Sequence, residues 1–98
     1  MRKFVIEREI DGVGSLSGAE LCGASATSNE ALAKLQPGIQ WVHSYVAGDR
    51  TFCIYLADDE ALIHEHAKLS GFPATRIYEV QAVIDPSTAG RKDLANAA

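Results

Sequence analysis

The sequence predicts a single α+β domain in which a four-stranded antiparallel sheet carries two helices on one face. Three observations lead to this prediction. The chain has 98 residues, which suffices for one compact domain. Its apolar residues alternate in some segments and recur at helical spacing in others. The resulting elements follow the order strand, helix, strand, strand, helix, strand. This order is typical of a ferredoxin-like sandwich with the sheet order 4-1-3-2.

The first strand is predicted over residues 3–10. Phe4 and Ile6 fall on one side of it, whereas Val5 and Glu7 fall on the other, which is the alternation of a half-buried strand. A glycine-containing turn sequence follows directly and ends the strand.

The first helix is predicted to begin with a capping box. The hydroxyl of Ser17 can accept a hydrogen bond from the amide of Glu20, and the Glu20 carboxylate can reach back. The helix runs to about Leu35, since Pro37 follows as a stop signal. Small residues and leucines share one face of this helix, and we expect that face to pack on the sheet. Its members are Leu21, Ala24, Ser25, Ser28, Ala31, Leu32 and Leu35.

The second strand, predicted over Ile39–Ala47, carries the most informative side chains. Strict alternation places Trp41, His43 and Tyr45 on one face and smaller residues on the other. A tryptophan, an imidazole and a phenol make a surface that is costly to leave in water. We therefore expect this face to be covered or to bind a ligand.

A Gly-Asp pair predicts a hairpin from this strand into the next one. The second helix ends at a glycine, and the end of the chain has no periodic apolar face. The predicted elements are strand Arg50–Ala57, a helix from Asp58 or Asp59 to Gly71, strand Thr75–Ile84, and a tail with an ordered start near Asp85 and a frayed end. We expect one domain over residues 1–88 and a flexible tail over residues 89–98.

The register of the hairpin remains open at this point. A two-residue loop would bring Phe52 and Ile54 to the face of His43. A bulge or a loop of odd length would instead bring Cys53 and Tyr55 to that face.

The sheet face opposite the helices is expected to be open. On the predicted phases it presents Glu7, Trp41, His43, Tyr45, Ile77, Glu79 and Gln81, whereas Tyr78, Val80, Ala82 and Ile84 would face the helices. A face that mixes aromatic side chains with carboxylates and a histidine is commonly closed by a second subunit. We therefore expect a homodimer in the form of a dimeric α+β barrel.

The three histidines are the side chains that titrate near neutral pH. Helical geometry sends His64 to solvent and His66 to the apolar face, where it is either a hydrogen-bonded core residue or a ligand. For His43 a ligand or acid–base role competes with a plain interface role. Glu7 and Glu79, expected on the same face, are candidate metal ligands or simply salt-bridged carboxylates near Arg8 or Arg76.

Composition excludes several classes of function. The net charge is -4 and the pI is about 5.2, which argues against nucleic-acid binding. Charged residues interrupt the N-terminal segment, and no apolar run approaches the ~18 residues of a membrane span. The protein is thus expected to be cytoplasmic. Neither cysteine belongs to a Cys-x-x-Cys pair, so Cys53 is interpreted as a small apolar filler.

An ordered set of short motifs resembles a known family. The motifs are Trp41 to Val46, Cys53 to Tyr55, Glu65 to Ala67, Gly71 to Ala74, Glu79-Val80 and Ile84 to Pro86. Together they resemble the small bacterial nickel-binding domain-of-unknown-function family over residues 3–88. The resemblance implies a dimeric ferredoxin-like protein and, because a characterised actinobacterial relative binds nickel, it also implies metal binding.

Two functions of different classes follow from these observations. The first is a nickel buffer or sensor without catalysis, with a site formed by His43 and at least one of Glu7, Glu79 and His66. Imidazole and carboxylate ligands do not by themselves select nickel over other divalent transition metals. The second is a small dimeric enzyme in which His43, Tyr45 or Tyr55 acts as acid or base on an organic substrate. A pure dimerisation module is a third reading.

Overall fold

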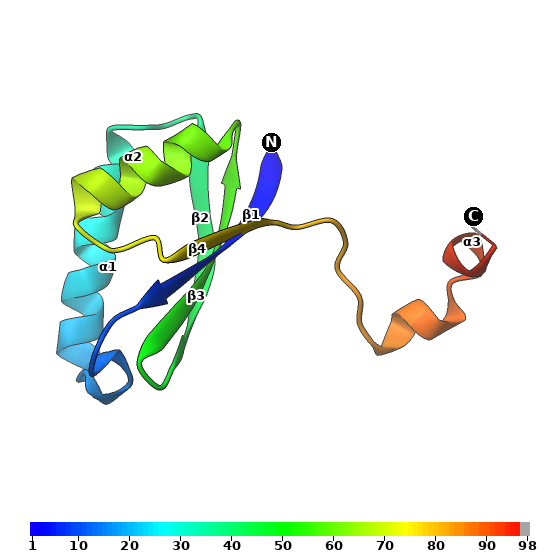
Figure 1. Ribbon diagram of the computed structural model, residues 1–98, viewed down its shortest axis with the longest axis horizontal. Helices are drawn as coiled ribbons and strands as arrows, with labels where there is room; N and C mark the ends of the chain where they lie inside the picture. Colours follow the sequence, from blue (N-terminus) through cyan, green and yellow to red (C-terminus); the bar gives the residue numbers. More distant parts are fainter. Residues whose placement is uncertain (97–98) are drawn as a thin grey trace.

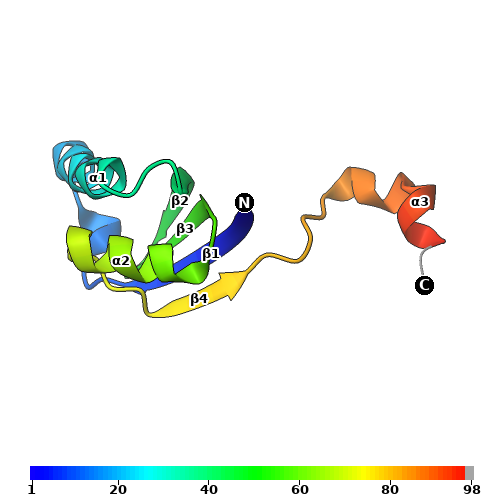
Figure 2. The ribbon, with the colours of Figure 1, turned by 90° about the horizontal axis from the view of Figure 1, so that it is seen from above.

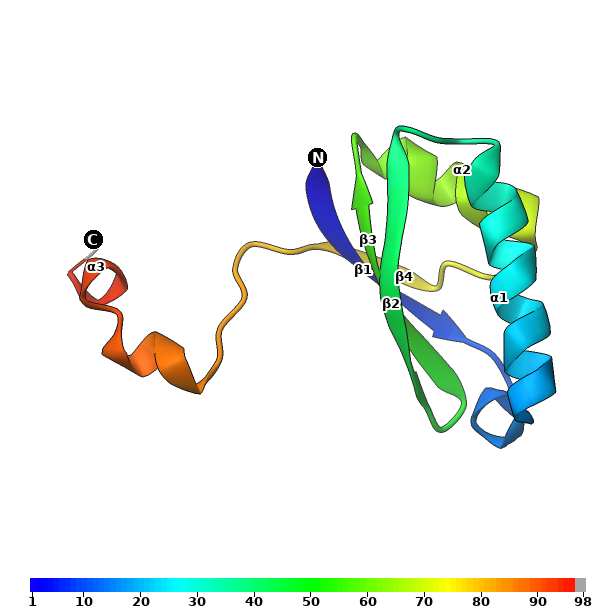
Figure 3. The same cartoon turned by 180° about the vertical axis from the view of Figure 1, so that it is seen from behind.

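The computed structural model describes residues 1–96. Its main elements are β1 (Arg2–Glu9), α1 (Gly18–Ala33), β2 (Ile39–Ala47), β3 (Arg50–Ala57), α2 (Glu60–Ser70) and β4 (Arg76–Glu79). The strands form one antiparallel sheet in the order β2-β3-β1-β4, and both long helices lie on the same side of it (Figure 1). Within the described residues, no helix covers the other face of the sheet (Figure 3). This α+β arrangement is consistent with the ferredoxin-like sandwich expected from the element order.

Both long helices begin at their predicted caps, and α2 ends at the predicted glycine, whereas α1 ends at Ala33, two residues before the predicted Leu35. The hydroxyl of Ser17 accepts a hydrogen bond from the Glu20 amide at 3.2 Å, and Glu20 Oε1 accepts one from the Ser17 amide at 3.0 Å, which completes the capping box. Asp59 caps α2 by accepting a hydrogen bond from the Leu62 amide at 3.3 Å. Gly71 ends α2 with φ = 80°, a left-handed conformation that glycine adopts without steric cost.

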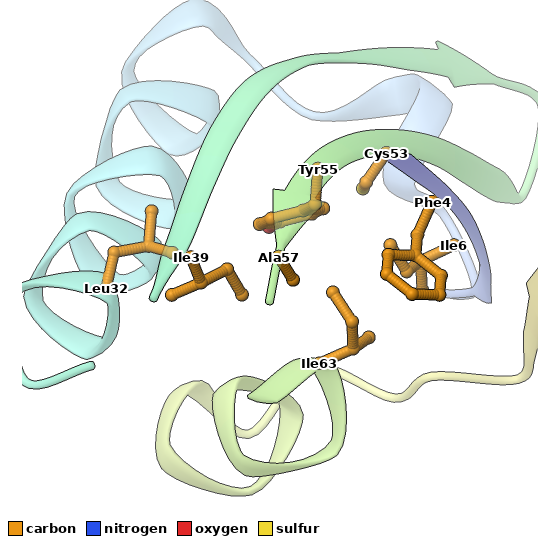
Figure 4. Close-up of a cluster of buried hydrophobic side chains, with 8 residues drawn as sticks. All are labelled: Phe4, Ile6, Leu32, Ile39, Cys53, Tyr55, Ala57 and Ile63. Atoms are coloured by element: carbon orange, nitrogen blue, oxygen red, sulfur yellow. The ribbon is translucent and has the colours of Figure 1, made fainter. Parts of the chain in front are cut away.

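The core lies between the sheet and the two helices. Alternate residues of β1 and β3 point into it, and α1 and α2 close it from outside (Figure 4). The predicted inner face of the first helix is confirmed, since its six residues within α1, and Leu35 just beyond the end of α1, are all buried or half-buried. The buried apolar cluster consists of Phe4, Ile6, Leu32, Ile39, Cys53, Tyr55, Ala57 and Ile63.

A β-bulge in β2 changes the predicted face of Trp41. Trp41 lies opposite the core residue Tyr55, but the next paired residue is His43, opposite Ile54, so that Val42 is an extra residue in this strand. The bulge shifts the alternation of side chains between the two sheet faces by one position. Trp41 therefore packs against the core, and only His43 and Tyr45 remain on the open face. The prediction that Trp41, His43 and Tyr45 share a face was wrong. It assumed strict alternation along the strand, and a bulge adds a residue that alternation does not take into account.

The hairpin itself has the register of a two-residue loop beyond the bulge. His43 pairs with Ile54 and Tyr45 pairs with Phe52, so that Phe52 and Ile54 share the open face with them. Cys53 lies on the helix side and is buried, in agreement with its interpretation as a small core residue. The alternative register, with Cys53 on the open face, does not occur.

Strand β4 is shorter than predicted, and its side chains point the other way. Ile77 pairs with Ile6 and packs against the core, and Glu79 pairs with Phe4 on the same side. Tyr78 faces the open side instead, since it pairs with Val5. The sequence of this strand has apolar residues in both phases, so its pattern does not decide which side chains face the helices. Pairing with β1 determines that.

Residues beyond β4 leave the body of the molecule. The amide of Val80 still donates to the Lys3 carbonyl at 2.8 Å, but β1 begins at Arg2 and offers no further partners. The chain then runs outward to η2 (Pro86–Gly90) and α3 (Lys92–Ala95) (Figure 2). Val83 and Ile84 are 71% and 78% exposed, so the prediction that Ile84 faces the helices was wrong.

The start of this outward segment, which we call the C-terminal arm (residues 81–96), is ordered as expected near Asp85. Asp85 caps η2 by accepting hydrogen bonds from the amide and hydroxyl of Ser87. The predicted frayed end includes residues 97–98, which lie outside the described residues. Within residues 1–96, no helix combines the length and the apolar character that crossing a membrane requires.

Candidate functional site

The open sheet face carries a histidine paired with a tyrosine. His43 and Tyr45 are two positions apart on β2, beyond the bulge, and therefore lie side by side on one face. Nε2 of His43 lies 3.1 Å from the Tyr45 hydroxyl, and the two rings meet edge to face with centroids 5.0 Å apart. Both side chains are exposed, and Tyr45 keeps 59% of its surface in solvent. In the tautomer whose Nε2–H donates to the phenol oxygen, Nδ1 carries the free lone pair that a metal ligand requires.

Glu7 shares this face but is occupied by arginines. Its Oε2 lies 3.0 Å from Nη1 of Arg76 and 3.3 Å from Nε of Arg50, and its side chain is only 15% exposed. The expected partnership with Arg76 is thus present. Two guanidinium groups neutralise the carboxylate, so a metal ion would have to compete with both of them. Glu7 also lies on β1, separated from His43 by the whole width of β3.

Glu79 and His66 lie on the other side of the sheet. Glu79 pairs with Phe4 at the edge of the sheet and contacts Arg2 at 3.6 Å. His66 is only 1% exposed, between α1 and α2, and its ring packs against that of Tyr55 with centroids 5.3 Å apart. Neither residue shares a surface with His43. Tyr55, an acid–base candidate in the enzyme hypothesis, is also buried on the helix side.

His66 is a hydrogen-bonded core histidine, one of the two roles expected for it. Its Nε2 lies 3.1 Å from the Ser28 hydroxyl. Burial lowers the pKa of His66, and the nearby charge of Arg8 lowers it further. Burial likewise raises the pKa of Tyr55, against smaller opposing effects of Ser28 and Arg8. His64 is exposed and contacts Glu60 at 3.3 Å, so the opposite directions predicted for His64 and His66 are confirmed.

Arg8 is the residue that sequence reasoning missed. It was expected near the surface carboxylates, but it is only 2% exposed and donates from Nη1 to the carbonyls of Phe72 and Pro73 at 3.2 and 2.9 Å. The signal was present in the alternation of the first strand, because Arg8 continues the buried series of Phe4 and Ile6. A side chain on the same face of β1 as Phe4 and Ile6 is expected to be buried, and for Arg8 this means a buried guanidinium.

Within the described residues of one chain, the candidate metal ligands do not come together as a group. Among residues 1–96, no group of three or more histidine, cysteine, aspartate or glutamate side chains is close enough to hold a metal ion. The structure brings His43 and Tyr45 together, keeps Glu7 on the same face, and separates Glu79 and His66 from them.

Comparison with known proteins gives two findings. Residues 4–80 match the family described as "Nickel responsive protein SCO4226-like". The fold is similar to the crystal structure of SCO4226 from Streptomyces coelicolor A3(2), with a TM-score of 0.67 and 14% sequence identity over 84% of this chain and 99% of that one. None of the curated proteins matches the chain.

Proposed function

Because the chain belongs to the family of SCO4226-like nickel-responsive proteins, we propose that it binds nickel, or another divalent transition metal, as a non-catalytic buffer or sensor. The observation that carries this proposal is the exposed imidazole of His43, which the Tyr45 hydroxyl orients on the open sheet face. Neutral imidazole is a good ligand for nickel, and a hydrogen-bonding neighbour that fixes the ring is a usual companion of a metal-binding histidine.

The remaining ligands come, in this proposal, from a second copy of the chain and from water. Within one chain the carboxylate of Glu7 on the open face is bound to two arginines. An isologous dimer formed through this face would present His43 twice across its two-fold axis. Such a dimer supplies two imidazoles where one chain supplies one.

The composition of the open face supports pairing with a second copy. Ile54 and Phe52 lie in the middle of it and remain half-exposed, and Tyr45 and Tyr78 are 59% and 55% exposed. Exposed apolar and aromatic side chains of this kind are typical of protein interfaces. The proposal therefore links metal binding to homodimer formation.

Calorimetric titration of the tag-free protein with nickel and zinc tests the metal proposal. We expect binding by the wild type and a loss of at least about tenfold in affinity for His43→Ala. His64→Ala is the matched control, because His64 is also an exposed histidine and lies on α2, away from the open face. The control should bind as the wild type does.

Two outcomes would overturn parts of this proposal separately. Equal affinities of the wild type and His43→Ala would remove His43 as the ligand. Absence of nickel and zinc binding by the wild type, together with no bound metal in elemental analysis, would remove the metal-binding function itself.

A further inference from the structure

The C-terminal arm has local structure of its own but, within residues 1–96, makes no hydrogen bond to the rest of the chain. Each of its hydrogen bonds, and its ion pair between Arg91 and Asp93, joins two residues of the arm. Every described residue of the arm is exposed except Thr88, which is half-buried. The arm therefore does not pack on the body of its own chain.

Two adjacent residues near the start of the arm, Val83 and Ile84, are apolar and largely exposed. Valine and isoleucine are among the residues that proteins most often bury. The arm carries them away from the body, since the radius of gyration of the chain is 15.5 Å and its longest dimension is 46 Å. A compact domain of this length has a radius of gyration of only about 13 Å. The arm thus presents an apolar pair to another molecule.

The arm leaves the body on the side that the proposed dimer would occupy. Figures 1 and 2 show α1 and α2 on one side of the sheet and the arm on the other side, beyond the open face. A second copy that packs on the open face therefore lies next to the arm. The arm also lies beyond residues 4–80, which match the nickel-responsive family, so it is a feature of this chain outside the matched domain.

The register of the sheet places the start of the arm level with the bulge of β2. Glu79 pairs with Phe4. Phe4 pairs with Tyr55, which in turn pairs with Trp41, so the end of β4 and the bulge lie at the same level on opposite edges of the sheet. When two such sheets face each other about a two-fold axis parallel to their strands, the β4 edge of each copy lies over the β2 edge of the other. Val42, which is 49% exposed, is the apolar residue at that level of β2.

We propose that the arm of each copy crosses to the facing sheet and packs Val83 and Ile84 against Val42 in β2 of the second copy. This inference rests on the homodimer proposed above. Facing sheets pack ~10 Å apart, and the five residues 80–84 span up to ~16 Å at ~3.3 Å per residue, so the arm is long enough. His43, the proposed metal ligand, directly follows Val42. The two arms therefore secure the dimer beside the two imidazoles.

Sedimentation equilibrium of Ile84→Ser, Val42→Ser and the double variant tests this contact. Each single substitution should weaken dimerisation at least about tenfold, because it changes both symmetry-related contacts of the dimer. The double variant should be little weaker than the weaker single variant, since two residues in contact give non-additive effects. Ile84 is exposed in one chain, so Ile84→Ser should leave the circular dichroism and the urea unfolding of the monomer unchanged. If Val42→Ser does not fold, Ile84→Ser decides.

Leu69→Ser is the matched control, because Leu69 is also an exposed apolar residue but lies on α2, away from the open face. Its dimer affinity should equal that of the wild type.

Three results would overturn the arm contact. Unchanged dimer affinity of Ile84→Ser would remove the arm from the interface and leave the homodimer itself in place. Strictly additive effects of the two substitutions would show that Ile84 and Val42 do not meet. A monomeric wild type would remove both the arm contact and the dimer. The nickel titration of His43→Ala is measured separately and tests the metal site in each of these cases.

Discussion

The hydroxyl of Ser28 lies 3.1 Å from Nε2 of His66, and this contact joins α1 to α2 inside the core. Both side chains are almost fully buried, with 5% and 1% of their surfaces exposed. Nδ1 of His66 has no partner among the described residues 1–96, so Ser28 provides the hydrogen bond that the buried ring makes there. The imidazole is therefore stable in this position only in its neutral form.

The stability of the fold should consequently fall in mildly acidic solution. Burial and the charge of Arg8 lower the pKa of His66 below its ordinary value of 6.5, so the unfolded chain takes up a proton at His66 before the folded chain does. The stabilisation from neutral His66 is present above pH 6.5 and is lost as the pH falls below it. Urea unfolding between pH 7.5 and 5.5 should show a slope of at most about 1.4 kcal/mol per pH unit from this residue.

His66→Gln tests the origin of that slope. The variant should be less stable than the wild type at pH 7.5 and should lose most of the pH dependence in this window. His64→Gln, which changes an exposed histidine of the same helix, should keep it. If both variants retain the wild-type slope, another group is responsible.

Much of the fold was predictable because it depends on local signals. The capping box at Ser17, the end of α2 at Gly71 and the inner face of α1 follow from neighbouring residues and helical period. The errors arose where pairing with a strand distant in the sequence determines which side chains face the core. The bulge at Val42 and the phase of β4 are set by pairing with β3 and β1, which the sequence of a single strand does not contain.

The candidate site was predictable only in part for the same reason. His43 and Tyr45 are two residues apart on one strand, so alternation brings them together without reference to any other element. Glu79 and His66 depended on the phase of β4 and on the packing of α2. Arg8 was overlooked because a buried arginine contradicts the usual preference of charged side chains for the surface.

Trp41→Ala should destabilise the monomer rather than the dimer. A tryptophan on the open face would act mainly at an interface, but Trp41 packs against the core and its Nε1 donates to the Ser44 hydroxyl at 2.9 Å. Truncation leaves a cavity and an unused partner, so we expect a loss of about 2 to 4 kcal/mol in the free energy of unfolding. Urea unfolding at several protein concentrations measures it. A large change in dimer affinity with little change in monomer stability would show that Trp41 acts at the interface and not in the core.

A pair of glycine substitutions should have opposite effects. A Cβ atom on Gly14 would lie 2.5 Å from the backbone carbonyl oxygen of Gly48, where the β2–β3 hairpin turn meets η1, so Gly14→Ala forces two backbone segments apart. We expect a loss of about 1 to 3 kcal/mol. Gly23 is exposed in α1 with no atom within 4 Å of such a Cβ, and Gly23→Ala should stabilise the helix by about 0.5 to 1 kcal/mol. Melting temperatures that shift in the same direction would contradict this contact.

The proposed dimer makes a prediction about Ile54, which lies in the middle of the open face between His43 and Val5. Ile54→Asp adds a charge there without disturbing the opposite, buried side of β3. A carboxylate at the centre of a sheet-to-sheet interface would be desolvated without a partner, which commonly costs at least 2 kcal/mol of binding free energy. Light scattering should therefore report a dimer for the wild type and a monomer of about half that mass for Ile54→Asp.

Ala26→Asp is the control for Ile54→Asp, because it adds the same charge at an exposed position of α1, and it should remain dimeric. If metal binding requires the second copy, Ile54→Asp should also lose nickel affinity although His43 is intact. A wild type that is monomeric at micromolar concentration, with or without nickel, would contradict the interface. A monomeric Ile54→Asp that still binds nickel as tightly as the wild type would instead confine the metal site to one chain.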